Sequence, residues 1–266
     1  MIEKISSLQN AGIKRVVRLR TKKSREARGL TIVEGNREVR QAFLAGLRFH
    51  SVYICREGVY HVDEALAKEL LDARVKIYDT GCAVFGKMSY GDRVDGILGL
   101  VERPEVTLEN LKLSANPLIV VMEGVEKPGN LGAVLRTCDG AGVEALIVCD
   151  EKTDIYNPNV IRASLGAVFA VQTVSCTNKE AVEFLRMKGV KTFAAVVQAK
   201  EFYYDKDLSG PCAIVMGSEQ DGLSDLWRRS ADDAVRIPMC GKVDSLNVSV
   251  SAAVMVYEAL RQRGKI

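Results

Sequence analysis

The feature that most constrains this chain is an alternation of short apolar runs and helical segments that begins at Leu118. The runs are almost continuously apolar, which is typical of strands buried on both faces. Such strands occur in parallel sheets that are covered by helices on each side. The pattern therefore predicts a parallel α/β domain in the C-terminal part of the chain.

The elements of this domain follow from the same periodicity. The expected strands cover residues 118–124, 145–149, 171–175, 192–197, 212–217 and 234–238. The expected helices cover residues 130–141, 159–168, 179–188, 223–231 and 247–263.

The N-terminal part has the pattern of a smaller α/β unit. Its expected strands cover residues 30–35, 49–54, 75–78 and 97–101, and its expected helices cover residues 14–25, 38–44 and 62–71. Pro104 and Pro117 bracket a polar stretch that favours a linker. We therefore expect one domain over residues 1–104, a linker over 105–116 and a second domain over 117–266.

Composition excludes several classes of protein. No apolar run approaches the ~20 residues of a membrane span, and the N-terminus lacks the apolar core of a signal peptide. The 7 cysteines are scattered and form no C-x-x-C pair, which disfavours a zinc site or a disulfide framework. A reducing cytoplasm is therefore the expected location. Cys138 and Cys212 lie in apolar runs and are expected to be core residues.

Positive charge is concentrated near the N-terminus. Residues 1–50 carry twelve basic and four acidic residues, whereas the whole chain has a net charge of only +3. A local basic block indicates binding to phosphate backbones, although a solvated helix face explains it equally well on composition alone. The candidate RNA-binding residues are Arg15, Arg18, Arg20, Lys22, Lys23, Arg25 and Arg37.

Three expected strands of the C-terminal domain are followed by loops richer in polar residues and glycine than packing requires. These loops cover residues 123–137, 215–223 and 237–253. In open α/β sheets, ligands bind beyond the carboxyl ends of the strands. The third loop leads into a helix that begins near Asn247, and helix capping by Asn247 is the alternative explanation for its polar residues.

The residues of these loops exclude several kinds of chemistry. No G-x-G-x-x-G follows a strand, and no phosphate-binding G-x-x-x-x-G-K-[ST] is present. Both histidines, His50 and His61, precede the C-terminal domain, which therefore lacks the usual general base. The candidate metal ligands are not clustered, so no metal is expected. Amides, one carboxylate, hydroxyls and Arg136 remain, a set suited to positioning and charge stabilisation around a cofactor.

Taken together, the three loops resemble the sequence motifs of the SpoU (TrmH) family of RNA ribose 2′-O-methyltransferases. The matching positions are Asn130, Gly132, Arg136 and Thr137; Gly217, Glu219, Gly222 and Leu223; and residues 237–249. Residues 157–167 also resemble the family. Residues 33–35 and the following helix with Arg37 resemble, less specifically, the small ribosomal-protein-like RNA-binding domain of some members.

The resemblance implies a SPOUT fold with a deep C-terminal trefoil knot, a homodimer whose active site is completed across the interface, and S-adenosylmethionine as the cofactor. The implied cofactor-binding residues are Val196, Val197, Gln198, Gly217, Ser218, Glu219, Gly222, Ile237, Met239, Ser245 and Leu246. The implied catalytic residues are Asn130, Arg136, Glu219, Ser245 and Asn247.

The implied reaction is attack of a ribose 2′-hydroxyl on the sulfonium methyl group. Because arginine almost never loses its proton, Arg136 is easier to understand as a phosphate clamp than as a base. We expect 23S rRNA as the substrate, with tRNA as the alternative. A catalytically inactive RNA-binding homologue and a nucleotide-dependent oxidoreductase are the rival functions.

Overall fold

The computed structural model describes residues 2–90 and 94–265 and divides into two compact units. The first unit contains Met1–Glu105 and Tyr156–Ala170, and the second contains Val106–Ile155 and Val171–Ile266. The inserted segment Tyr156–Ala170 joins the first unit through its backbone, because the Thr31 hydroxyl donates a hydrogen bond of 2.7 Å to the carbonyl of Tyr156.

The second unit is built on a parallel sheet, as the apolar runs predicted, but it has seven strands where six were expected. The additional strand, β10, has only two residues and shows no apolar run. Its strands are β6 (Leu118–Glu123), β7 (Ala145–Cys149), β8 (Gln172–Cys176), β9 (Lys191–Ala195), β10 (Glu201–Phe202), β11 (Cys212–Met216) and β12 (Asp233–Arg236). They lie in the order β10-β12-β9-β11-β6-β7-β8, in which the buried strands β11 and β6 are neighbours in the interior of the sheet. The trefoil knot stays a prediction.

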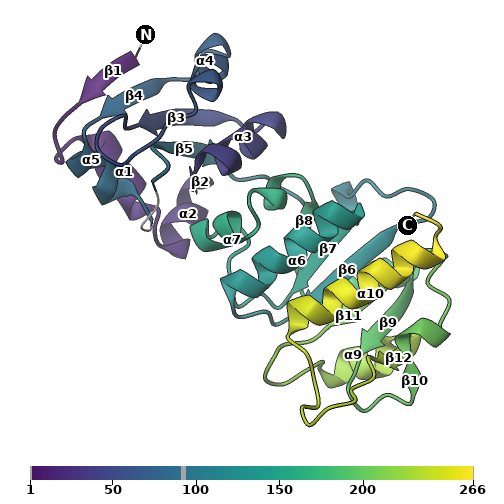
Figure 1. Cartoon of the computed structure of the whole chain (residues 1–266). Coiled ribbons are helices and arrows are strands. Elements are labelled where there is room, and N and C mark those ends of the chain that lie inside the picture. Colours follow the sequence, from purple (N-terminus) through teal and green to yellow (C-terminus); the bar gives the residue numbers. More distant parts are fainter. Residues whose placement is uncertain (1, 91–93, 266) are drawn as a thin grey trace. The chain divides into compact units, whose positions relative to one another are not determined.

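Helices cover both faces of this sheet because alternate side chains of each strand point to opposite sides. Helices α6 (Pro128–Ala141) and α10 (Val248–Gln262) pack against each other on one face, where Figure 1 shows them side by side in teal and yellow. Helices α8 (Asn178–Met187) and α9 (Asp225–Ser230) contact each other and enclose the core with Ile147, Val215 and Trp227. Within the described residues, every helix is too short or too polar to cross a bilayer.

The first unit contains a mixed five-stranded sheet in the order β1-β4-β3-β5-β2 (Figure 1). Its strands are β1 (Ile2–Ile5), β2 (Leu30–Glu34), β3 (Phe49–Ile54), β4 (Ile77–Thr80) and β5 (Ile97–Glu102). Its helices are α1 (Ala11–Arg18), α2 (Lys22–Arg28), α3 (Asn36–Leu44), α4 (Glu64–Asp72), α5 (Cys82–Met88) and α7 (Pro158–Ala163). The separate N-terminal α/β unit was predicted, but β1 and α5 were missed because both are short.

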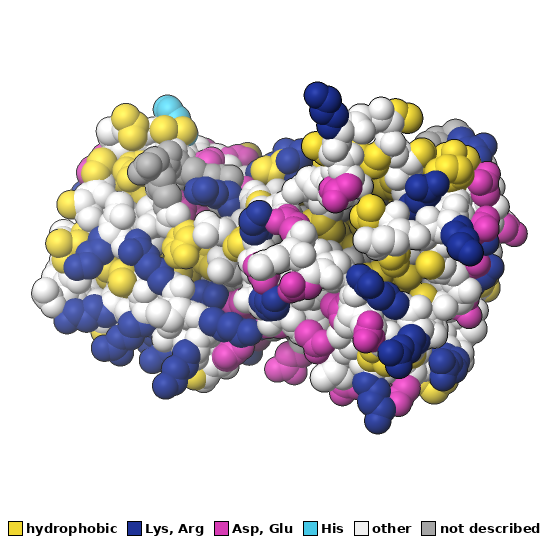
Figure 2. Space-filling view, turned by 90° about the horizontal axis from the view of Figure 1, so that it is seen from below, with side chains coloured by type: hydrophobic (Ala, Val, Ile, Leu, Met, Phe, Trp, Pro, Cys, Tyr) yellow, Lys and Arg dark blue, Asp and Glu magenta, His cyan; other side chains and the backbone are white. Residues whose placement is uncertain are grey.

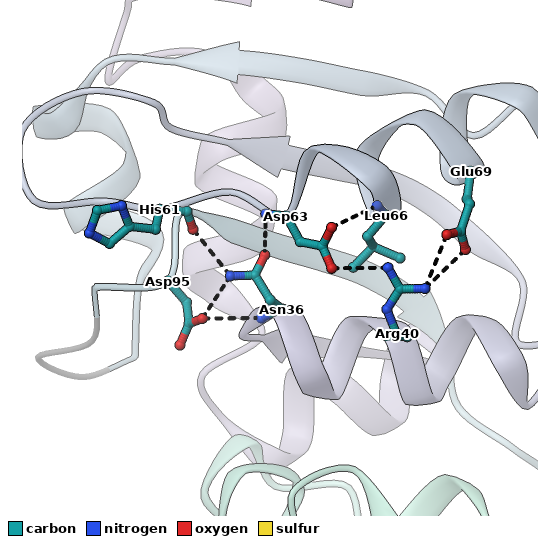
Figure 3. A network of polar contacts seen from close by, with 7 residues as sticks. All are labelled: Asn36, Arg40, His61, Asp63, Leu66, Glu69 and Asp95. Carbon is teal, nitrogen blue, oxygen red and sulfur yellow. Dashed lines mark hydrogen bonds and ion pairs between the residues drawn. The ribbon is translucent and has the colours of Figure 1, made fainter.

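Helix α3 is tied to its surroundings by the polar network drawn in Figure 3. The side-chain amide of Asn36 donates to Asp95 and to the carbonyl of His61, and its oxygen accepts from the backbone N–H of Asp63. One turn later, Arg40 pairs with Asp63 at 2.9 Å and with Glu69 at 3.1 Å. The network fixes α3 against the start of α4, so we assign it a structural role.

The basic segment expected as one helix over residues 14–25 forms two helices instead. Helix α1 ends at Arg18, and the Thr21 hydroxyl accepts from the backbone N–H of Ser24 to cap α2. Because Thr21 caps the start of α2, its conformation is not compatible with an unbroken continuation of α1.

The break also overturns the prediction that Arg25 binds RNA. Its side chain is only 1 % exposed, and its guanidinium donates to the carbonyls of Leu19 and Arg20 at 2.8 and 3.0 Å. These carbonyls lie at the interruption between α1 and α2. Arg25 therefore donates the hydrogen bonds that the carbonyls of this turn accept, and its side chain is buried too deeply to reach a phosphate.

The core of the second unit contains a buried polar link between three of its elements. Asn178, at the start of α8, donates to the carboxylate of Glu123 at the end of β6 and accepts from the indole N–H of Trp227 at 2.6 Å. The second oxygen of Glu123 accepts from the backbone N–H of Ser224 at 2.8 Å. Because these groups are buried, each depends on the others for its hydrogen bonds.

We predict that Asn178→Ala lowers the free energy of unfolding by about 3 kcal/mol, because it leaves one oxygen of a buried carboxylate and a buried indole N–H without a partner. Urea unfolding followed by fluorescence measures this. The control is Asn116→Ala, since Asn116 makes an exposed bond to the carbonyl of Ser209. Equal losses in the two variants would contradict the assignment.

Candidate cofactor and nucleotide site

A cavity of about 550 Å³ opens beyond the carboxyl ends of three neighbouring strands of the second unit, β12, β9 and β11. Its walls come from the segments that follow these strands and from the loop that leads into α10. Parallel strands bring their carboxyl ends to one edge of the sheet, so segments far apart in sequence converge there.

The cavity collects the residues that sequence analysis assigned to the cofactor. All eleven line it, namely Val196, Val197, Gln198, Gly217, Ser218, Glu219, Gly222, Ile237, Met239, Ser245 and Leu246. Their role in binding stays a prediction.

Gly217 is required by the tightness of the loop after β11. A Cβ atom at this position would lie 2.2 Å from the carbonyl carbon of Gly222 and 2.4 Å from the backbone nitrogen of Leu223. The loop closes through reciprocal backbone hydrogen bonds of 3.1 Å between Ser218 and Gly222. Only glycine fits between these two backbone segments, so the first wall of the cavity depends on it.

A second cavity of about 190 Å³ adjoins the first. On one side it is lined by Val125 and Lys127 from the loop after β6 and by Asn130 from the first turn of α6, and on the other side by the loop after β11. Gly217, Ser218, Glu219, Gln220 and Val248 line both cavities and therefore form the wall between them.

Three of the predicted catalytic residues meet at this wall. The side-chain amide of Asn247 lies 3.3 Å from the oxygen of Asn130 and 3.5 Å from a carboxylate oxygen of Glu219. The other end of Asn247 caps α10, since its oxygen accepts from the backbone N–H of Ser249 at 2.9 Å. Asn247 therefore has two roles at once: it caps α10, and its side-chain amide contacts Asn130 and Glu219.

Lys127 completes this cluster and was missed in the sequence analysis. Its ammonium lies 2.6 Å from the second carboxylate oxygen of Glu219, and this hydrogen bond raises the pKa of Lys127. Lys127 lies within the first of the three predicted loops, but no motif includes it, and only the fold brings it to Glu219.

The two other predicted catalytic residues lie apart from the wall. Arg136 is an exposed residue of α6 and lines neither of the two cavities. Ser245 lines the larger cavity, where its hydroxyl donates to Asp244 at 3.2 Å.

The larger cavity also has basic residues that no motif indicated. Arg228 donates from Nε to the carbonyl of Leu223 at 2.9 Å and so supports the loop after β11. The guanidinium of Arg236 lies 4.7 Å from the ring centroid of Phe202, and its buried Nε has no hydrogen-bond partner among the described residues. Arg236 ends β12 directly before Ile237, so a search of strand ends would have found it.

The basic surface of the first unit keeps most of its predicted RNA-binding residues exposed. Figure 2 shows Lys and Arg side chains gathered on this unit, and the exposed members of the predicted set are Arg15, Arg18, Arg20, Lys22, Lys23 and Arg37. Arg20 also has a local role, because it donates to the carbonyls of Lys87 and Ser89 at 2.9 and 2.6 Å.

Cys138 and Cys212 are buried core residues, as predicted, and burial raises the pKa of the Cys138 thiol to about 12. Within residues 2–90 and 94–265, no group of three or more His, Cys, Asp and Glu side chains is arranged to hold a metal ion.

The fold and the three loops define an α/β protein with a ligand cavity at the carboxyl ends of its parallel strands. The sequence profile of the SpoU rRNA Methylase family matches residues 117–257. An MRM3-like substrate binding domain matches residues 10–99. The chain belongs to the SpoU methylase family.

Two relatives illustrate the similarity in sequence. The 23S rRNA (guanosine-2′-O-)-methyltransferase RlmB of Vibrio parahaemolyticus is 38% identical over 181 residues, which are 66% of this chain and 73% of that protein. The protein of the same name from Photobacterium profundum is 35% identical over 204 residues, covering 74% of this chain and 83% of that protein.

Two solved structures extend the similarity over nearly the whole chain. An RNA 2′-O ribose methyltransferase matches with a TM-score of 0.84 and 38% identity, covering 98% of this chain and 99% of that one. The AdoMet-bound rRNA methyltransferase from Sinorhizobium meliloti matches with a TM-score of 0.89 and 27% identity, covering 98% of each chain.

We predict that Gly217→Ala weakens S-adenosylmethionine binding by at least about tenfold and destabilises the fold by about 3 kcal/mol, because the added carbon collides with backbone atoms of the same loop. Calorimetric titration and thermal unfolding measure the two effects. Gly210→Ala is the matched control, since a Cβ atom there meets nothing within 4 Å. Wild-type affinity in Gly217→Ala would show that the loop is not a wall of the cofactor site.

Proposed function

We propose that this chain transfers a methyl group from S-adenosylmethionine to a ribose 2′-hydroxyl of 23S rRNA. The observation that carries this proposal is the convergence of Asn130, Glu219 and Asn247, from three segments far apart in sequence, on the wall between two adjoining cavities. A group-transfer enzyme needs such a pair of sites, one for the donor and one for the acceptor, with positioning groups between them. The names of the relatives support rRNA as the acceptor.

The larger cavity fits the cofactor. Gly217, Ile237 and Leu246 would hold it largely through backbone groups, with Val196 and its neighbours as the opposite wall. The missing side chain at Gly217 lets the loop after β11 close on its own backbone, which keeps this wall of the cavity in place. S-adenosylmethionine supplies the electrophilic methyl group, and the chain supplies binding and orientation.

The chain's own residues would prepare the attacking hydroxyl. The oxygen of Asn247 is held by the cap of α10. Its side-chain amide would therefore keep Asn130 and Glu219 in position. These two residues would hold the ribose facing the methyl group. A charged arginine bound to the adjoining phosphate would lower the pKa of the hydroxyl and stabilise the developing alkoxide.

Arg136 would provide this charge from the partner subunit of a homodimer. The proposal is supported by its position, since it is exposed on α6 and lines neither cavity of its own chain. The adjoining helix α10 exposes large apolar side chains, with Val250 48% and Tyr257 44% exposed, which a second copy would cover. A dimer through α6 and α10 would bury this face and bring Arg136 to the partner's site.

A reducing cytoplasm is the proposed location. It is supported by the cysteines, all 7 of which are free thiols.

We predict that the wild-type protein transfers tritium from methyl-labelled S-adenosylmethionine to 23S rRNA and that Arg136→Ala lowers the rate at least about 100-fold, because charge stabilisation of the alkoxide is lost. Mapping 2′-O-methyl groups in total RNA with and without the protein identifies the acceptor and separates rRNA from tRNA. Arg186→Ala, at an exposed arginine of α8, is the control. Near-normal transfer by Arg136→Ala would refute its catalytic role.

Mixing two inactive variants tests the shared site. A heterodimer of Arg136→Ala with Asn247→Ala would contain one intact site, because the remaining arginine and the remaining asparagine meet across the interface. We expect the mixture to regain activity that neither variant has alone. If both residues served the same chain, every site in the mixture would lack one of them and the mixture would stay inactive.

We propose that α1 and α2 bind the RNA backbone. Lys22→Gln with Lys23→Gln should weaken RNA binding and reduce the slope of log K against log salt by roughly 0.7 to 0.9 for each lost contact, since each contact releases counterions. Lys68→Gln with Arg74→Gln is the charge-matched control in and after α4, which packs with α3, whereas α1 packs with α5. An equal change of slope in both double variants would contradict a localised RNA surface.

A further inference from the structure

The exposed ion pair between Lys127 and Glu219 lies where an RNA substrate would enter. The ammonium and the carboxylate oxygen are 2.6 Å apart, yet 71% of the Lys127 side chain and 29% of the Glu219 side chain are exposed. An exposed pair of this kind contributes little to stability because water competes for both charges. It can therefore be replaced by another ionic contact at little cost.

The second cavity needs a positive charge if RNA is to enter it. Among the described residues that line this cavity, Lys127 carries the one positive charge, whereas Glu126 and Glu219 are acidic. Glu126 is already neutralised by Lys152 outside the cavity, at 2.6 Å. An entering phosphate would be repelled by Glu219 unless a cation stood between them.

The location of Lys127 allows it to move between the two anions. It is the last residue before α6 and has an extended backbone, so its long side chain starts from the loop that forms one wall of the second cavity. Its hydrogen bond to Glu219 raises its pKa. A flexible point charge of this type suits a phosphate partner.

We propose that Lys127 binds a phosphate next to the target ribose, in addition to the contact proposed for Arg136, and that Glu219 holds the lysine ammonium in position until the RNA arrives. The inference rests on the proposed RNA methyltransferase function and assigns a substrate contact to a residue outside the sequence motifs. The phosphate replaces one carboxylate oxygen as the partner of Lys127, while Asn247 continues to orient Glu219 through its other oxygen.

Lys127→Met tests the proposal through RNA binding and methyl transfer. The KM for RNA should rise about tenfold, and the slope of log K against log salt should fall by roughly 0.7, which is one phosphate contact to a single strand. The affinity for S-adenosylmethionine should stay within about twofold of wild type, which also reports an intact fold. Lys127→Arg should restore most of the affinity for RNA because it keeps the charge.

Two further variants separate this contact from general effects of charge. Lys152→Met removes an equally short ion pair to Glu126, but Lys152 lines neither cavity, so the KM for RNA should stay within about twofold. In a Glu219→Gln background, where no carboxylate is left unpaired, Lys127→Met should still weaken RNA binding. If the loss disappears in that background, the lysine only neutralises Glu219 and the proposal is wrong.

The proposal and the underlying function fail in different ways. If wild type methylates RNA and Lys127→Met does so with an unchanged KM and salt slope, Lys127 does not contact the phosphate. If Lys127→Met loses cofactor affinity instead, the lysine serves the larger cavity and the proposal is again overturned. If wild type transfers no methyl group to any RNA, the proposed function itself fails, and this inference fails with it.

Discussion

The geometry of the site depends on the buried carboxylate of Glu123. One of its oxygens is held by Asn178, and the other accepts from the backbone N–H of Ser224, directly after the loop that Gly217 begins. A carboxylate this deep in a protein is stable only when its hydrogen bonds are complete. The central strand β6 is thereby joined to the end of the loop that follows its neighbour β11. The loop that forms the wall between the two cavities is consequently anchored to the core at its end.

The site combines buried hydrogen bonds, which keep their partners, with an exposed ion pair, which can exchange its partner. The contacts of Glu123 and Asn178 are buried and therefore persist, whereas Lys127 and Glu219 meet in water. Asn247 joins the folded helix to the exposed ion pair. Its oxygen accepts a hydrogen bond from the first turn of α10, and its amide contacts Glu219. This arrangement suits a site that binds and releases a polyanion, because only the exposed contact between Lys127 and Glu219 has to change partners.

Sequence patterns predicted the features that depend on local periodicity and on strand ends. The central strands are buried on both faces, so their apolar runs were recognisable. The residues that the family resemblance assigned to the cofactor all line the larger cavity, and their role in binding stays a prediction. The missed features depend on contacts between distant residues. Lys127 and Glu219 are 92 positions apart, and Glu123 and Ser224 are 101 positions apart, so no spacing rule indicates either pair. Arg25 was misassigned because the carbonyls that bind it are freed only by the break between α1 and α2.

The distribution of charge explains why a polyanion could be drawn to this chain without being held too tightly. Residues 1–50 have a net charge of +8, so the remaining residues must have a net charge of −5. Under the proposed function, long-range attraction of a polyanion would act on the first unit, where neutralised phosphates would release counterions. The catalytic unit, being acidic overall, would repel RNA except where a specific cation meets a specific phosphate. Binding energy from the basic unit would then hold the substrate while the few cations at the cavities select one ribose.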